Sequence, residues 1–176
     1  MSFIGRTRTL LSLSGLRNLV SDSMAIDMGS ASTIISVRGR GVVVDEPSLV
    51  AVDTVNGEVI AIGREAEQKY GREERGVTVI APLVNGVVAD FERTREMLAH
   101  LVGKARSGLS LSARRALMSV FSDVTEVERR ALLSAAQHAK VGKVGMIEEG
   151  LAAAFGSGVK ADDPHGSAVV DIGGGT

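Results

Sequence analysis

The sequence predicts an α/β fold in which a small α+β lobe is inserted into a larger domain of sheet and helices. Two patterns predict it. From residue 77 onward, short β-branched runs alternate with segments of helical periodicity, which is typical of a sheet covered by helices. Before that point, strand-like runs follow one another with only turn residues between them, which indicates antiparallel neighbours. The 176 residues are 44% hydrophobic, enough to bury a core.

The composition excludes several classes of function. Lysine and arginine number 20 against 21 acidic residues, so no net charge draws the chain to nucleic acid. Cysteine is absent, which excludes disulfides and thiolate zinc sites and fits a reducing cytosol. Only 3% of the residues are aromatic, too few for a stacking platform for bases or sugars. We therefore expect a cytoplasmic protein with no nucleic-acid partner.

Residues 1–23 form a basic leader. Within residues 1–20, Arg6, Arg8 and Arg17 accompany an apolar face, and there is no acid. The apolar run is too short and too interrupted by serine and glycine to span a bilayer, and it lacks a small-residue cleavage site for secretion. Such a segment suits the surface of the inner membrane. The alternative is a loose terminus, or a helix docked on the body of the protein.

Residues 24–50 begin the larger domain with antiparallel strands. Met24–Ile26 leads into the turn Asp27–Ser30, and the β-branched run Thr33–Val37 follows. After a turn marked by two glycines, Val42–Val44 forms the next apolar run. This order is strand, tight turn, strand, turn, strand.

Residues 51–92 form the inserted lobe. The runs Leu49–Asp53 and Val59–Ile62 flank Asn56-Gly57, which is a strong signal for a β-hairpin. The other elements expected here are the short helix Arg64–Tyr70 and the strand Val77–Ile80.

Residues 93–176 return to the larger domain with alternating helices and strands. Thr125 and Glu128 fit a capping box, in which a hydroxyl and a carboxylate satisfy the free amides at a helix start. The helix that they begin is expected to run to about Ala139. The other expected elements are the helices Glu92–Leu101 and Leu151–Phe155 and the strands Ala116–Phe121, Val144–Ile147 and Ala168–Ile172.

Two glycine-bearing loops follow predicted strands and are candidates for phosphate binding. The first, Asp27–Thr33, places an acid at a strand end before a glycine and several hydroxyls, although alone it equally fits an ordinary turn. The second, Asp171–Thr176, has three consecutive glycines, whose entropic cost favours a loop that meets a ligand with its main chain. Together they suggest two opposed clamps around one metal-nucleotide.

The pair Glu148-Glu149 is a third candidate, because it lies between a predicted strand and a helix of small residues. A carboxylate at a strand end that faces a phosphate cleft can orient or deprotonate an attacking water. The alternative is structural, since acids at a helix start interact favourably with the helix dipole.

These motifs, in this order, resemble the MreB-like bacterial actins, within the superfamily that also contains heat-shock chaperones and sugar kinases. The resemblance extends from Met24 to Thr176 and rests on AIDMGSASTIISVRGRGVVVDEPSLVAVD, NGVVADFERTREML, VTEVERRAL, MIEEGLAAAFGSG and VVDIGGGT. It implies an actin-like (ribonuclease H-like) first domain. Residues 24–50 and 93–176 would form its subdomain IA, and residues 51–92 the inserted subdomain IB.

The resemblance also implies a site for ATP and Mg²⁺. Asp27 and Asp171 would act on the metal through its waters, and Glu149 and Thr176 would be the catalytic pair that positions the hydrolytic water. The implied nucleotide-binding residues are Gly29, Ser30, Ala31, Ser32, Gly173, Gly174, Gly175 and Thr176.

Six positions depart from the family pattern. They are Ser30 and Ser32 in place of Thr and Asn, Phe121 and Gly150 in place of Pro, and Ala81 and Val84 in place of basic residues. The two serines keep hydroxyl donors but lose a side-chain amide, and Phe121 and Gly150 alter the rigidity of loops near the expected cleft. The last two weaken the expectation of filament contacts of the family type.

Members of this family continue past the second loop into a second domain that completes the nucleotide site. Residues 1–176 contain only the first domain, so we expect a shortened form that by itself binds and hydrolyses ATP weakly or not at all. The resemblance implies a cytoskeletal role in cell shape and cell-wall morphogenesis. The implied partners are further copies of the chain or a full-length MreB-like paralogue, and the cell-wall synthesis machinery.

Other functions on the same fold are alternatives to this interpretation. The chain would then be half of a small-molecule kinase or of a chaperone-type ATPase, or a non-catalytic partner of a full-length MreB-like protein. A kinase would need a polar substrate pocket between its lobes, and the sequence uses that region for hairpin strands instead.

Overall fold

The structure is a computed structural model that describes residues 23–71, 76–106, 115–160 and 165–175. Residues 1–22, which contain nearly all of the expected basic leader, lie outside this range, so membrane contact by the leader stays a prediction. Among the described residues, no helix combines the length and the apolar character needed to cross a membrane.

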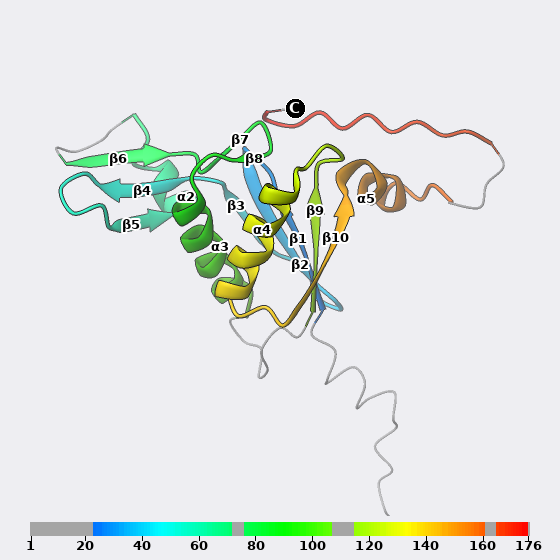
Figure 1. The fold of residues 1–176 in the computed structure, drawn as a ribbon, viewed down its shortest axis with the longest axis horizontal. Coiled ribbons are helices and arrows are strands. Elements are labelled where there is room, and N and C mark those ends of the chain that lie inside the picture. Colours follow the sequence, from blue (N-terminus) through cyan, green and yellow to red (C-terminus); the bar gives the residue numbers. More distant parts are fainter. Residues whose placement is uncertain (1–22, 72–75, 107–114, 161–164, 176) are drawn as a thin grey trace, which may run out of the picture.

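A five-stranded mixed sheet is the centre of the fold, with strand order β10-β9-β1-β2-β3 (Figure 1). Strands β1 (Ser23–Met28), β2 (Ser32–Val37) and β3 (Gly41–Pro47) are antiparallel neighbours, as the short turns between them predict. Strands β9 (Arg115–Val120) and β10 (Lys143–Glu148) join the other side of β1 and run parallel to it. This confirms the α/β class.

Two helices, α3 (Phe91–Arg106) and α4 (Glu126–His138), pack side by side on one face of this sheet (Figure 1). The pleat sends alternate residues of β1 into the core, where Met24, Ile26 and Met28 are buried. Helix α3 meets them with residues at helical spacing, including Met97, Leu98 and Leu101. Among the described residues, α5 (Glu149–Gly156) covers part of the opposite face of the sheet.

The capping box at the start of α4 is confirmed. The hydroxyl of Thr125 accepts from the amide of Glu128, and the Glu128 carboxylate accepts from the amide of Thr125 at 2.8 Å. The backbone hydrogen bond from Thr125, followed by that from its hydroxyl, lowers the pKa of Glu128. Helix α3 runs five residues past the predicted end at Leu101, because Val102 and Ala105 continue its buried stripe.

The inserted lobe consists of a three-stranded antiparallel sheet, in the order β5-β4-β6, and the short helix α2 (Arg64–Glu67). Its strands are β4 (Val50–Asp53), β5 (Val59–Ile62) and β6 (Val77–Ile80). The predicted Asn56-Gly57 hairpin joins β4 and β5, and Gly57 has a φ of 74°. Helix α2 ends before the predicted Tyr70, and residues 68–71 form turns.

Glu46 of β3 joins the two parts of the fold. Its side chain is 8% exposed, accepts a 2.8 Å hydrogen bond from the amide of Arg64 at the start of α2, and pairs with Lys104 of α3. Gly63 lies so close that a Cβ there would be 2.7 Å from the Glu46 carboxylate. Burial by itself would raise the pKa of Glu46, but these hydrogen bonds and the two positive charges lower it.

The predicted strand Ala168–Ile172 is wrong. These residues form no strand, and Val170 and Ile172 are 81% and 85% exposed. A β-strand needs a neighbouring strand as hydrogen-bond partner for its backbone groups. Within the described chain this segment pairs with no strand. It runs as extended chain along the top of the view in Figure 1, from beyond α5 to the β7–β8 hairpin.

The structure contains one element that is not predicted from the sequence, a hairpin of β7 (Leu83–Val84) and β8 (Val87–Val88). Asn85 and Gly86 form its two-residue turn, with φ values of 50° and 73°. Positive φ at both positions is the geometry that Asn-Gly favours in hairpins.

Candidate functional site

Three parallel strands, β1, β9 and β10, end at the same edge of the main sheet, and the candidate site lies there. Ile26 pairs with Met118, and Met118 pairs with Met146, so the residues that follow stand side by side across the three strands. Open α/β sheets bind ligands beyond the carboxyl ends of their strands. The register therefore brings Asp27 and Ser119 together, and Glu149 directly follows the end of β10 at the same edge.

The first glycine loop is a tight turn between β1 and β2, closed by a 3.0 Å hydrogen bond from the amide of Gly29 to the carbonyl of Ser32. Ser48, which is fully buried, fixes it from below. The Ser48 hydroxyl donates to the carbonyl of Gly29 at 2.6 Å, and its amide donates to the carbonyl of Ala31 at 3.0 Å. The loop is therefore held by the main sheet, which leaves its outer amides free to face a ligand.

The β7–β8 hairpin holds the same loop from the side. The amide of Gly86 donates to the hydroxyl of Ser30 at 2.7 Å, across 56 residues of sequence. Only glycine fits at position 86, since a Cβ there would lie 1.4 Å from the ring of Phe121. This contact is not among the predictions from the sequence, although Asn85-Gly86 between two apolar pairs is a hairpin signal that could have indicated it.

The second glycine loop touches the first. A Cβ on Gly174 would lie 2.4 Å from the Cβ of Ala31, and a Cβ on Gly175 would lie 3.1 Å from the hydroxyl of Ser30 and 3.2 Å from the Cα of Asn85. The distance at Gly174 is shorter than Cβ atoms show, and the distances at Gly175 are tighter than most Cβ contacts. Glycine is thus needed at Gly174 and favoured at Gly175 where the two loops meet.

The two loops enclose a cavity of about 130 Å³. Its lining comprises Asp27, Gly29, Ser30, Ala31, Ser32, Phe121, Glu149, Asp171, Gly173, Gly174 and Gly175. Every residue predicted for the site lines this cavity except Thr176, which lies outside the described residues. Phe121 adds an aromatic ring to the wall, and Gly150, the second residue of α5, faces open space.

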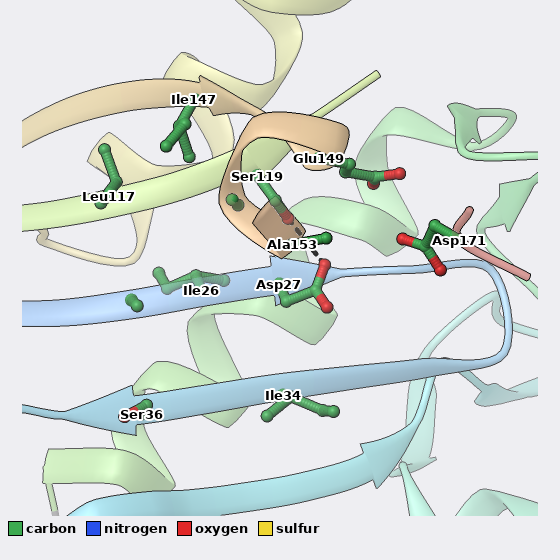
Figure 2. A pocket seen from close by; sticks show the side chains of 12 residues that line it. Ile26, Asp27, Ile34, Ser36, Leu117, Ser119, Ile147, Glu149, Ala153 and Asp171 are labelled. Carbon is green, nitrogen blue, oxygen red and sulfur yellow. Dashed lines mark hydrogen bonds between the residues drawn. The ribbon is translucent and has the colours of Figure 1, made fainter. Parts of the chain in front are cut away.

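Three carboxylates gather at this cavity, those of Asp27, Glu149 and Asp171 (Figure 2). Burial raises the pKa of Glu149 above its usual value, and the negative charges of Asp27 and then Asp171 raise it further. Glu149 is the first residue of α5, so the helix start sets its position. The Ser119 hydroxyl donates to Asp27 Oδ1 at 2.6 Å (Figure 2), a contact that is not predicted from the sequence either.

The donor set fits a hard cation that keeps its waters. Within the described part of the chain, no three His, Cys, Asp or Glu side chains converge closely enough to form a metal-binding cluster. The oxygens of Asp27 and Asp171 nevertheless face the same cavity. Mg²⁺ prefers oxygen ligands, dehydrates reluctantly and is usually held by one or two carboxylates together with phosphates.

A second cavity, of about 310 Å³, adjoins the first on the partly covered face of the sheet (Figure 2). Asp27, Glu149 and Asp171 belong to both. The rest of its wall is mainly apolar and comes from β1, β2, β9, β10 and α5: Ala25, Ile26, Ile34, Ser36, Leu117, Ser119, Ile147, Ala152 and Ala153.

Comparison with known proteins identifies relatives over almost the whole chain. The family model described as MreB/Mbl protein matches residues 21–176. Cell shape-determining protein Mbl of Bacillus subtilis is 41% identical over 153 residues, which cover 87% of this chain and 46% of that protein. Cell shape-determining protein MreB of Escherichia coli is 41% identical over 169 residues, which cover 93% of this chain and 49% of that protein. The chain thus spans a little under half the length of these relatives.

Solved structures show the same fold. MreB5 of Spiroplasma citri bound to ADP superposes with a TM-score of 0.71 and 32% identity, over 80% of this chain and 42% of that one. The same protein bound to AMPPNP gives a TM-score of 0.70 and 33% identity, over 78% of this chain and 41% of that one. The MamK double helical filament, 20% identical with a TM-score of 0.65 over 78% of this chain and 44% of that one, shows the fold alone.

Proposed function

Because the chain belongs to the MreB/Mbl family of bacterial actins, we propose that it acts in the cytoskeleton that determines cell shape and directs cell-wall morphogenesis, and that its two glycine loops hold the phosphates of ATP with Mg²⁺. The contact between Gly174 and Ala31 is the observation that carries the nucleotide part of this proposal. It joins two loops from opposite ends of the chain in one small cavity that has carboxylates at its rim.

Each loop has a defined part in this proposal. The main-chain amides of Ser30–Ser32 and Gly173–Gly175 donate to phosphate oxygens, because the glycines of the two loops allow close approach. Asp27 and Asp171 hold the waters of Mg²⁺, which when bound neutralises phosphate charge. Glu149 positions the attacking water together with Thr176. The raised pKa of Glu149 suits a group that must accept a proton from that water.

The size of the cavity sets the expected strength of binding. Pockets for small ligands usually measure about 300–1,000 Å³, whereas this one measures about 130 Å³. The two loops by themselves thus form a cradle of phosphate size, and the wider cavity that adjoins it lies on the partly covered face of the sheet. We propose that the 176-residue chain alone binds ATP in the millimolar range and does not hydrolyse it unless further residues complete the site.

Assembly is the second part of the proposal. Exposed apolar residues such as Leu151, Phe155 and Ile172 give this chain surface that a partner can cover. We propose self-association or co-assembly with a full-length MreB-like protein, as a non-catalytic partner or a filament subunit. The proposed location of this assembly is the cytoplasm. The cell-wall synthesis machinery is the further proposed partner, and residues 1–20 are the proposed contact to the cytoplasmic membrane.

An NMR titration with magnesium-ATP tests the site. In the wild-type chain, we expect amide shifts at both glycine loops that saturate only at millimolar nucleotide. Gly174→Ala forces the loops apart, since its Cβ would meet that of Ala31 at 2.4 Å, and should abolish the shifts. Gly166→Ala is the matched control from the same segment, where a Cβ meets nothing within 4 Å. Submillimolar affinity of the wild-type chain for ATP would contradict the proposal that its site is incomplete. Amide shifts only outside the two loops, or no shifts at all, would contradict the proposed location of the site.

A further inference from the structure

We propose that Ser119 is a positioning residue for Asp27, and that its hydroxyl holds the Asp27 carboxylate in the orientation that accepts the waters of the nucleotide-bound Mg²⁺. The inference rests on the proposed nucleotide site, because it assigns Asp27 the role given there. It is carried by one contact, the 2.6 Å hydrogen bond from Ser119 Oγ to Asp27 Oδ1 across neighbouring strands.

The strand register makes this contact a fixed feature of the sheet. β1 and β9 run parallel and pair Ile26 with Met118, so the next residue of each strand, Asp27 and Ser119, stand next to one another on the face that α3 and α4 do not cover. Figure 2 shows the Ser119 hydroxyl pointing at the carboxylate from the strand beside it. The two residues are 92 positions apart in sequence, and only the sheet brings them together.

The neighbours of Ser119 on this face of the sheet are mainly apolar. The same face carries Leu117 two residues earlier on β9 and Ile147 opposite on β10, both apolar. Serine is a poor strand former and fills less of this surface than valine or isoleucine would. Packing therefore favours an apolar residue at this position, whereas the carboxylate of Asp27 favours a donor.

The effect on Asp27 follows from the charge around it. Asp27 lines the same small cavity as Glu149 and Asp171, and negative charges so placed repel one another. A free aspartate can turn away from them about its χ1 and χ2 bonds. A hydrogen bond from a neutral donor to an ionised carboxylate is stronger than one between neutral groups, so Ser119 offsets the repulsion. It engages Oδ1 and leaves the second oxygen for a metal-bound water.

Measurement of nucleotide affinity with and without Mg²⁺ tests the proposal. In NMR titrations of the full 176-residue chain with ADP, Ser119→Ala should reduce the Mg²⁺-dependent gain in affinity about five- to tenfold, the loss expected for one hydrogen bond to a charged group at a partly exposed site. Affinity for ADP in the presence of a chelator should not change. Ser119→Thr keeps the hydroxyl, suits a strand and should restore the gain.

Ser36→Ala is the matched control, since it removes a hydroxyl from the same sheet face on β2, where Ser36 pairs with Ala25 and not with Asp27. It should leave the Mg²⁺ gain at the wild-type value. An equal loss in Ser36→Ala and Ser119→Ala would assign the effect to the sheet surface and overturn the proposal. So would an unchanged gain in Ser119→Ala.

A second measurement separates this inference from the proposed function. The χ1 angle of Asp27 can be followed through side-chain couplings in the ligand-free chain, where we expect one rotamer in the wild type and averaging among rotamers in Ser119→Ala. A single rotamer in both proteins would overturn the positioning role. If the rotamers differ as expected but the wild type shows no Mg²⁺-dependent gain, Ser119 holds Asp27 and the proposed nucleotide function is wrong.

Discussion

Replacement of Glu46 by glutamine should destabilise the fold by about 2 kcal/mol, because this side chain joins the main sheet, α3 and the inserted lobe. Its carboxylate accepts from the amide of Arg64 at 2.8 Å and pairs with Lys104. A hydrogen bond to a charged group contributes about 1.5–3 kcal/mol, and the ion pair adds little because Lys104 is 53% exposed. Glutamine can still accept from the amide of Arg64 through its carbonyl oxygen, but without the negative charge that hydrogen bond is weaker, and most of the loss comes from this weakening.

The pH dependence gives the same prediction a second test. The pKa of Glu46 is lower in the folded chain than the ordinary value of 4.5 that it has when unfolded. A lowered carboxyl pKa stabilises the fold fully above the unfolded-state value, and this contribution is lost as the pH falls through the folded-state pKa. Glu46→Gln should therefore be less stable than the wild type at neutral pH and approach it in stability as the solution becomes acidic.

Urea unfolding followed by circular dichroism measures both the loss of stability at neutral pH and its pH dependence. A change in the midpoint urea concentration with an unchanged slope reports a change in the free energy of unfolding. Glu67→Gln is the matched control, because Glu67 is an exposed acid on α2 close to the same junction. Its effect should stay within about 0.5 kcal/mol. Equal stability of the two variants at neutral pH, or a Glu46→Gln deficit that persists unchanged in acid, would refute the account of Glu46 as the link between the two parts.

Three further predictions concern the loops and the capping box, and urea unfolding measures each. Gly86→Ala should destabilise by at least about 2 kcal/mol, since the position has a φ of 73° and its Cβ would overlap the Phe121 ring; if Phe121→Ala in the same chain recovers none of this loss, the overlap is not its cause. Ser48→Ala should cost about 1–3 kcal/mol, because the buried hydroxyl bonds the Gly29 carbonyl, and a neutral result would contradict its role as an anchor. Thr125→Ala should cost about 1 kcal/mol through loss of the capping box, whereas Thr125→Ser should cost much less; equal losses would argue against the cap.

The sequence predicts the parts of this fold that depend on local signals. β-branched runs predict β2 and the lobe strands, and a threonine with a glutamate three residues later predicts the start of α4 at Thr125. The glycine loops could be found because glycine is costly in an ordinary turn and needed in a close approach, and the structure places Gly174 against Ala31. Both signals lie within a few residues of sequence.

What the sequence could not predict depends on distant partners. Ala168–Ile172 has the composition of a strand, but composition does not show whether a neighbouring strand is present, and none is within the described chain. The strands of the β7–β8 hairpin have two residues each, too short for any periodicity. The hydrogen bond from Ser119 to Asp27 depends on the parallel register of β1 and β9, which no local pattern specifies.

The central claim is that the two glycine loops hold one metal-nucleotide between them, and paramagnetic broadening by Mn²⁺ tests it most directly. Mn²⁺ replaces Mg²⁺ with ADP in the ligand-bound chain and broadens amide signals near the metal. We predict that the amides of Gly29 and Gly174 broaden together, at the same Mn²⁺ and ADP concentrations, while those of Gly103 and Gly166, which do not line the cavity, stay sharp. Broadening at one loop without the other, or equal broadening at all four glycines, would contradict the claim.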